Sequence, residues 1–273
     1  MNPPPTYVRV NTLGATEESI VEKLGSEGVK LESLPLKYTY KVLEAKQPLN
    51  SLGSYKEGLF YVQDKASCFA TQAADPKEGS VVFDICAAPG AKTTYLAQLM
   101  QNRGAIYSVD FSPRRMWTWK RETARMKTHI AESVIADACA ALPLEAEADL
   151  VVLDPPCTGT GIFAKQPSAK WRITPKSIGK MAEIQWKMIN SCAEKVAAGG
   201  ILIYSTCSIT VEENEMIVER FLKWQNEFSL VEIEPKIGLP GLRGLTQCQR
   251  LYPHIHQCNG FFIAKLQKNR QND

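Results

Sequence analysis

The chain has 273 residues, of which 44% are hydrophobic and 22% charged, and its formal net charge at pH 7 is +3. This composition is typical of a globular protein with one substantial core and a smaller attached unit, and so small a charge does not by itself indicate a polyanionic partner. No apolar run approaches the roughly 18 residues of a membrane span, and the N-terminus lacks a secretory signal, so we expect a cytoplasmic monomer with no membrane partner.

The first 75 residues contain both strand and helix patterns. YVRVNTL (7–13) predicts a strand, ATEESIVEKLGSEG (15–28) a helix that ends at Gly28, and TYKVLEA (39–45) another strand. A Gly-rich turn then leads into an apolar helical stretch. The turn residues PKEG (76–79) follow, so we expect an N-terminal portion, residues 1–75, and a larger domain, residues 76–273.

From residue 80 onward, strand and helix patterns alternate. Strands are predicted at residues 80–86, 105–110, 133–138, 149–154 and 200–207, with two late strands at 230–235 and 260–266. Helices are predicted at residues 91–100, 114–126 and 182–200. Such alternation predicts a parallel, doubly wound α/β sheet with helices on both faces.

Residues able to bind ligands follow five of these strands. In a doubly wound sheet, ligands bind outside the carboxyl ends of the strands. Those ends carry residues 84–92, Asp110, Asp137, residues 154–157 and residues 206–208. Five such ends at one rim predict a functional site there.

The first of these segments, DICAAPGAKTT (84–94), is a turn of small residues that opens into a helix. Small side chains let backbone N–H groups approach a ligand, and a helix N-terminus favours negative groups. The segment is neither a Gly-x-Gly-x-x-Gly motif nor a P-loop, and a structural turn explains it equally well. Asp110 and Asp137, taken singly, are also explained as helix caps. In order on successive strands, they favour an adenosine-containing cofactor.

Two cysteines follow neighbouring strands, Cys157 in DPPCTGTG and Cys207 in YSTCS. A lone cysteine is most often a small buried hydrophobe. Two at adjacent strand ends instead suggest thiol chemistry. Carbon 5 of a pyrimidine becomes reactive only after a nucleophile adds to carbon 6, and a thiolate suits that addition.

The remaining cysteines give no evidence of disulfides or a metal site. There is no Cys-x-x-Cys pair, and several cysteines lie in apolar segments, as reduced thiols do. Cys248, His254, His256 and Cys258 are ligand types, but their spacing fits no common zinc motif. We expect no bound metal.

Positive charge gathers in two segments, residues 111–130 and 164–187, each with six Lys/Arg and one Glu. By itself this favours two solvated faces. It also matches the electrostatic footprint of a nucleic-acid-binding protein. Lys165, Lys170 and Arg172 follow the DPPC loop, where the phosphates beside a flipped-out base would lie.

These motifs together resemble one family. YVRVNTL, YVQDKAS, DICAAPGAKTT, DPPCTGTG, YSTCS with EENE after it, and GFFIAKL are similar, in the same order, to those of the RsmB/Nop/Sun family of RNA cytosine-C5 methyltransferases. The resemblance spans nearly the whole chain. It implies a Rossmann-like methyltransferase sheet, an RRM-like α+β N-terminal portion, S-adenosylmethionine as cofactor, and tRNA or rRNA as substrate.

The resemblance also implies a role for individual residues. Cys207 would be the nucleophile, Cys157 would assist release of the methylated RNA, Asp154 would steady the cytosine, and Lys92 would lie close to the reacting groups. The cofactor would contact Cys86, Ala87, Ala88, Pro89, Gly90, Ala91, Lys92, Asp110, Arg115, Asp137 and Asp154. Ala91 departs from the family, which usually has a glycine there, but it keeps the loop small.

Two alternative functions are compatible with the residues. A DNA cytosine-C5 methyltransferase would use Cys157 as its nucleophile, although such enzymes usually carry a long recognition insert that this compact chain does not offer. A non-catalytic RNA-binding relative would not need Cys157, Cys207, Asp154 and Lys92 together. The target nucleotide does not follow from the sequence.

Overall fold

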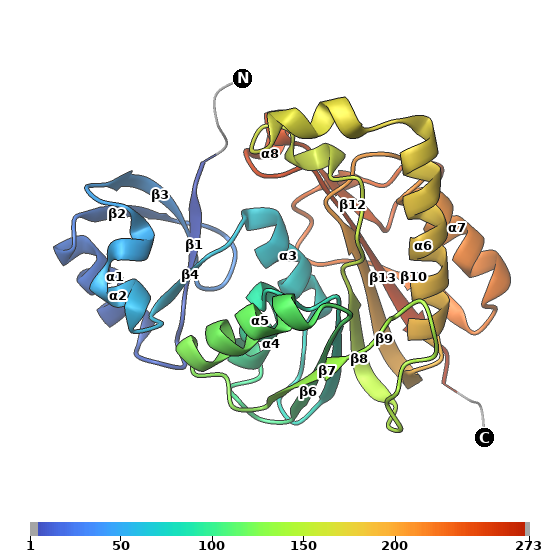
Figure 1. Ribbon diagram of the computed structural model, residues 1–273, viewed down its shortest axis with the longest axis horizontal. Coiled ribbons are helices and arrows are strands. Elements are labelled where there is room, and N and C mark those ends of the chain that lie inside the picture. The colour runs from blue at the N-terminus through green and yellow to red at the C-terminus, as the bar shows by residue number, and fades with distance from the viewer. Residues whose placement is uncertain (1–4, 271–273) are drawn as a thin grey trace.

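The computed structural model describes residues 5–270 and contains two β-sheets, each with helices packed against it (Figure 1). The smaller sheet is formed by the N-terminal residues, coloured blue. The larger sheet runs through the rest of the molecule, between helices on either side. Within the described residues, no helix is long and apolar enough to cross a membrane.

The N-terminal part is a four-stranded antiparallel sheet covered by helices on one face. Its strand order is β2-β3-β1-β4. The elements are β1 Tyr7–Val10, α1 Glu17–Ser26, β2 Val29–Ser33, β3 Thr39–Ala45, a 3-10 turn Leu49–Ser51, α2 Gly53–Lys56 and β4 Phe60–Val62. Thr16 caps α1 by accepting a hydrogen bond from the Ser19 N–H. The strands β2 and β4 were not predicted, because each is short and only partly buried.

All four residues of β1 are buried because both faces of this sheet are covered. Val8 and Val10 pack with Ile20 of α1. On the other face, the Arg9 guanidinium donates hydrogen bonds to Gln63 (3.0 Å) and to Thr94 (2.8 Å) of the larger part. The N-terminal sheet therefore packs directly on the larger part.

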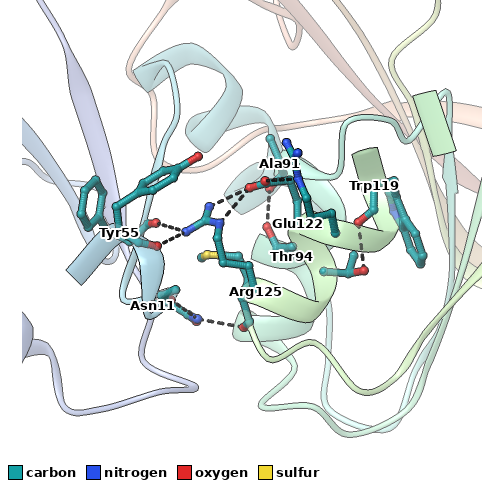
Figure 2. A network of polar contacts seen from close by, with 12 residues as sticks. Asn11, Tyr55, Ala91, Thr94, Trp119, Glu122 and Arg125 are labelled. Carbon is teal, nitrogen blue, oxygen red and sulfur yellow. Dashed lines mark hydrogen bonds and ion pairs between the residues drawn. The ribbon is translucent and has the colours of Figure 1, made fainter. Parts of the chain in front are cut away.

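Figure 2 shows a second polar contact between the two parts. Arg125 pairs with Glu122 at 2.7 Å and donates hydrogen bonds to the backbone oxygens of Tyr55 and Phe60 at 2.8 and 3.1 Å. Asn11 donates to the carbonyls of Gly58 and Met126. Buried polar groups must be paired in this way, so these contacts fix how the two parts meet.

The larger sheet has nine strands in a mixed arrangement. Eight of them lie in the order β11-β12-β13-β9-β8-β5-β6-β7, and β10 pairs with β13. The strands are β5 Val81–Ile85, β6 Ala105–Asp110, β7 Ala131–Ile135, β8 Ala148–Leu153, β9 Val196–Thr206, β10 Phe228–Val231, β11 Leu239–Pro240, β12 Gln249–Leu251 and β13 Phe261–Lys268. Strands β5 to β9 are mutually parallel, as predicted.

The last four strands are antiparallel, which corrects the expectation of an all-parallel sheet. The connection from β12 to β13 holds only a short helix, α8 Pro253–His256. Parallel neighbours need a crossover of about a dozen residues or more, so this short link favours an antiparallel pair. The predicted late strand 230–235 also ends early, at Val231.

Helices cover both faces of the large sheet. One face is covered by α3 Lys65–Ala74 and α4 Ala91–Leu99, which pack against residues such as Val82 and Val152. The opposite face is covered by α6 Pro175–Ala193 and α7 Glu215–Trp224, which pack against residues such as Phe83 and Val151. Helix α5, Pro113–Arg125, lies against β6, β7 and α4. The predicted helix 182–200 is displaced: α6 begins at Pro175 behind a Thr174–Ser177 capping box, and residues 196–200 belong to β9.

Candidate active site

The two rim cysteines come together at the ends of β8 and β9. Because these strands are parallel neighbours, the loops that follow them lie side by side. The sulfur atoms of Cys157 and Cys207 are 3.1 Å apart, and both residues are half-buried, free thiols. The sequence placed both at this rim, and the tertiary structure places them in contact.

The Cys157 thiol is held in its protonated form. The hydrogen bond to Cys207 raises the pKa of the Cys157 thiol well above its usual range, and burial and the charges of Asp154 and Glu213 act in the same direction. In the contact between the two sulfurs, either thiol can be the donor. A thiol with a raised pKa is a poor nucleophile, because the thiolate is the form that attacks.

An ion pair joins the first and fourth strand ends of the parallel sheet. Lys92, in the first turn of α4, contacts the carboxylate of Asp154, which follows β8. Burial lowers the pKa of Lys92, but the charge and hydrogen bond of Asp154 outweigh it, with help from Asp84 and Cys207, and the pKa rises. Lys92 therefore carries a positive charge beside the thiols.

Glu213 is a buried residue that sequence reasoning missed, although it belongs to the EENE stretch after YSTCS. Its carboxylate accepts hydrogen bonds from the Thr158 backbone N–H (2.8 Å), Ser208 (2.7 Å), Thr210 (2.9 Å) and Gln185 (3.0 Å). Thr158 follows Cys157, and Ser208 follows Cys207. One carboxylate thus ties the two cysteine loops together.

Gly161 permits a close approach between three loops. Its N–H donates to the Cys207 carbonyl at 2.9 Å, and its own carbonyl accepts from the Gly260 N–H at 2.8 Å. A Cβ at position 161 would lie 2.1 Å from the Gly260 oxygen. The second glycine of the DPPCTGTG motif therefore serves the packing of the loops.

The turn at residues 86–91 connects β5 to α4. Gly90 has φ 107° and begins α4 without a side-chain cap, so the first N–H groups of this helix are directed to the rim. Cys86 also has a positive φ, 63°, and the Ala88–Pro89 peptide is cis. The Ala87 N–H donates to the carbonyl of Val109 on β6. These contacts hold the turn against the neighbouring strand.

Asp110 and Arg115 support this turn from the end of β6. The Asp110 side chain is 0% exposed and pairs with Arg115 at 3.1 Å. It also accepts hydrogen bonds from the N–H groups of Ala88 (3.3 Å) and Ser112 (3.1 Å). Asp137 lies beyond the end of β7, exposed, and accepts a hydrogen bond from the Cys139 N–H at 2.9 Å. Both acids lie at the rim predicted for them, but Asp110 is already heavily bonded.

Asp84 is a buried acid on β5 beneath the turn. Burial raises its pKa from 3.8 to about 7, although a hydrogen bond from Thr93 at 2.5 Å and the charge of Lys92 oppose the rise. Trp119 in turn donates to the Thr93 hydroxyl at 2.9 Å. The carboxyl lies among the polar groups of the rim and is close to half-protonated at neutral pH.

The three predicted RNA-contacting residues differ in their surroundings. Lys165 forms an ion pair with Asp64 at 2.7 Å, which links the DPPC loop to the residue that caps α3. Lys170 and Arg172 belong to a short 3-10 helix, Pro167–Arg172, and both are exposed. Lys165 is therefore partly committed to an internal contact, whereas the other two face solvent.

The four residues of zinc-ligand type are separated by the fold. Cys248 and Cys258 belong to different buried clusters, on opposite faces of the large sheet. His256 accepts a hydrogen bond from the Tyr252 N–H through Nδ1 at 2.8 Å. In the part of the chain that the structure describes, no three His, Cys, Asp or Glu residues are grouped so as to hold a metal ion.

Comparison with known proteins identifies the chain. A family model described as 16S rRNA methyltransferase RsmB/F matches residues 71–267. The chain belongs to this family. The 28S rRNA (cytosine(4447)-C(5))-methyltransferase of Homo sapiens is 34% identical over 97% of the chain, and the tRNA (cytosine(72)-C(5))-methyltransferase of Pyrococcus horikoshii is 37% identical over 81%. The chain spans only 34% and 55% of the lengths of these two relatives, respectively.

Solved structures agree with this membership. NSun6 from Pyrococcus horikoshii, determined with SFG, superposes with a TM-score of 0.90 at 27% identity and covers 98% of this chain and 92% of that one. A methyltransferase homolog protein from the same organism gives a TM-score of 0.89 at 31% identity, covering 98% and 87%. The predicted Rossmann-like methyltransferase sheet is thereby confirmed for this RsmB/F chain.

Proposed function

We propose that the chain is an S-adenosylmethionine-dependent RNA (cytosine-C5-)-methyltransferase, active as a monomer, in which Cys207 bonds covalently to the target cytosine. The observation that carries the proposal is the contact between the Cys157 and Cys207 sulfurs, at the rim that also holds the Lys92–Asp154 ion pair. Addition of a thiolate to carbon 6 makes carbon 5 nucleophilic, and this chemistry requires a thiol at the rim.

The raised pKa of Cys157 supports different roles for the two cysteines. Cys207 forms the bond from sulfur to carbon 6. After carbon 5 has gained a methyl group, water accepts the proton that carbon 5 loses. The electron pair of that C–H bond forms the double bond between carbons 5 and 6, and the bond from Cys207 to carbon 6 breaks with its electrons on sulfur. Cys157, which keeps its own proton, donates a hydrogen bond to the departing Cys207 sulfur and so stabilises the leaving thiolate. Cys157 therefore assists release.

Asp154 and Lys92 are suited to hold the cytosine. A carboxylate accepts a hydrogen bond from the exocyclic amine of this base, as acids do when they recognise cytosine. The ion pair with Lys92 fixes the direction of the Asp154 side chain. We therefore assign Asp154 to orientation of the base and Lys92 to the support of Asp154.

The residues around the 86–91 turn fit S-adenosylmethionine, which supplies the methyl group from its sulfonium. The uncapped N–H groups at the start of α4 suit a carboxylate. Asp110 and Asp137 are acceptors suited to ribose hydroxyls and to the adenine amine, respectively. Asp110 also holds the turn in place, and Arg115 covers its carboxylate. The small residues 87–91 leave room for close approach of the backbone.

We further propose that the N-terminal part is an RRM-like unit that contributes to RNA binding. Its element order β-α-β-β-α-β and its strand order support this likeness. The proposed division at residues 75/76 lies after α3, but α3 packs on α4, β9 and β13, so a division just before Lys65 fits the packing better. Because the face that bears Arg9 is covered, RNA would contact the edges of this unit.

RNA is the substrate class that the relatives support. The human relative is named for 28S rRNA and the Pyrococcus horikoshii relative for tRNA. Five Lys/Arg residues between positions 163 and 181, with no acid among them, suit a polyanion near the cysteine loops. We therefore propose tRNA or rRNA, with Lys170 and Arg172 on its phosphates and Lys165 contributing beside its ion pair with Asp64.

Covalent trapping tests the proposal. RNA transcribed with 5-fluorocytosine cannot lose the group on carbon 5, so the wild-type protein should remain attached to it in a denaturing gel. Cys207→Ala should abolish both the adduct and methylation, because nothing attacks carbon 6. Cys157→Ala should allow attack and methyl transfer but stall release, so methylated natural RNA should stay joined to Cys207.

The same gels separate the alternatives. An adduct in Cys207→Ala that maps to Cys157 would indicate the arrangement of DNA enzymes and overturn the assigned roles. RNA binding without any adduct or methylation in the wild type would indicate a non-catalytic relative. Bisulfite sequencing of total RNA, with and without the protein, identifies the modified cytosine.

A further inference from the structure

Trp171 is an exposed aromatic residue that the fold does not explain. Its side chain is 89% exposed, on the short 3-10 helix Pro167–Arg172 between the cysteine loop and α6. This helix is drawn in yellow ahead of α6 at the top of Figure 1. A large aromatic side chain normally stabilises a protein by being buried, and most of this indole lies outside the packing of the chain.

The surroundings of Trp171 are cationic. Its neighbours in sequence are Lys170 and Arg172, and residues 163–181 contain five Lys/Arg and no Asp or Glu. Lys170 also lies 5.8 Å from the centre of the Phe163 ring. Aromatic rings interleaved with cations are the arrangement that binds single-stranded nucleic acid, because rings stack on bases and cations hold phosphates.

The same helix borders the candidate active site. A hollow of about 290 Å³ is lined by Cys157 and Thr158 on one side and by Ala169, Arg172 and Met181 on the other. Trp171 is therefore next in sequence to Arg172, which lines the same hollow as Cys157. A strand whose target base enters this hollow would bring its neighbouring nucleotides close to this helix.

We propose that Trp171 is a stacking platform for a base beside the target cytosine, with Lys170 and Arg172 holding the adjoining phosphates. This inference rests on the proposed RNA methyltransferase function and names a subsite for its substrate. When the target base is flipped out, the adjacent base loses one of its stacking contacts. The indole of Trp171 would stack on that adjacent base and replace the lost contact. Because every base has an aromatic face, the platform acts without regard to sequence.

The test uses a labelled 12-residue oligocytidylate and measures its affinity by fluorescence anisotropy. Trp171→Ala should weaken binding about tenfold, within the range that loss of one base–aromatic stack produces. Trp171→Phe should keep most of the affinity. Trp224→Ala is the matched control, since Trp224 is 73% exposed on α7, away from the hollow, and that variant should bind as the wild type does.

A second probe separates stacking from other effects. A chain of 12 abasic sites keeps the phosphates but has no bases. Trp171→Ala should bind this chain as well as the wild type does, whereas Arg172→Ala should weaken the binding of both probes. Equal losses on both probes for Trp171→Ala, or no loss on oligocytidylate, would overturn the proposal, and so would failure of the wild type to bind oligocytidylate.

Failure of this inference is distinguishable from failure of the proposed function. With saturating 5-fluorocytosine RNA, Trp171→Ala should still form the covalent adduct, because Cys207 and Cys157 are intact. Absence of an adduct in the wild type would overturn the methyltransferase proposal. A normal adduct together with unchanged oligocytidylate affinity in Trp171→Ala would overturn the platform alone.

Discussion

Asp84, Lys92 and Cys157 are titratable groups at one rim, and the charge of Asp154 acts on all three. Cys157 keeps its proton because its hydrogen bond with Cys207 and its burial raise its pKa, and Lys92 keeps its proton because Asp154 faces it. Asp84 is the group whose protonation changes near neutral pH. The charge of the rim is therefore set by burial and by immediate neighbours, more than by the +3 charge of the whole chain.

Asp84 makes stability depend on pH. Its pKa is about 7 in the folded protein against an ordinary value of 3.8, so between these values the folded state holds a proton that the unfolded chain has released. The free energy of unfolding should therefore fall as pH rises from about 4 to about 7, by up to a few kcal/mol. Asp84→Asn should lack this component.

Urea unfolding at pH 5 and pH 8 measures the effect. The difference between the two pH values should be smaller in Asp84→Asn than in the wild type. Asp75→Asn changes an exposed acid and should retain the wild-type difference. Identical differences in the wild type and Asp84→Asn would show that Asp84 ionises as an ordinary carboxyl.

The two cysteine loops illustrate how elements are fixed relative to one another. The loops after β8 and β9 have no regular backbone pairing of their own, yet Glu213 bonds to both, and Gly161 lets them approach. A carboxylate that accepts several hydrogen bonds restrains each donor, so the sulfur–sulfur distance depends on a residue that touches neither sulfur.

Glu213→Gln should slow methyl transfer by about tenfold or more. The amide accepts hydrogen bonds only at its oxygen, so donors that now bond to the second carboxylate oxygen would be left unpaired. Each buried donor without a partner costs about 1–3 kcal/mol of folding free energy. Cofactor affinity, measured by calorimetry, should change little, since the 86–91 turn is held by β6 and Asp110. The adjacent, exposed Glu212→Gln should behave as the wild type. Equal losses of cofactor affinity and turnover in Glu213→Gln would instead indicate general unfolding.

At the scale of the whole molecule, buried polar contacts join the N-terminal sheet to the large sheet. Arg9 reaches α4. Arg125 of α5 reaches the backbone of Tyr55 (Figure 2) and that of Phe60. The helix that carries Lys92 is thus held by the N-terminal part as well as by β5. We infer that the two parts unfold together.

Arg125→Ala should lower the free energy of unfolding by about 3 kcal/mol, because it leaves the Glu122 carboxylate buried without its partner. Arg121→Ala is the control on the same helix. Arg121 is exposed and its contact with Glu122 is long, 3.8 Å, so this change should lower the free energy of unfolding by less than about 1 kcal/mol. Chemical denaturation followed by circular dichroism gives both values. A second transition in the wild type would contradict joint unfolding.

Local patterns determined the parallel half of the fold and the chemistry of its rim. The alternation of strands and helices from residue 80 predicts β5 to β9, and the residues at their ends, including Cys157, Cys207 and Asp154, follow from that order alone. This succeeds because consecutive parallel strands connected by helices must end at one edge. The order does not tell which strands are neighbours: β8 lies beside β9 but is separated from β7 by two strands, so the contact of the two thiols follows from the tertiary structure.

Only the tertiary structure decided the contacts that depend on residues distant in the chain. The antiparallel edge from β10 to β13, the Glu213 bonds to Thr158, and the Lys165–Asp64 pair each join segments whose local sequence carries no sign of the partner. Periodicity reports which face of an element is buried, but it does not report what covers that face. The covering groups, and with them the protonation of Cys157, follow from packing.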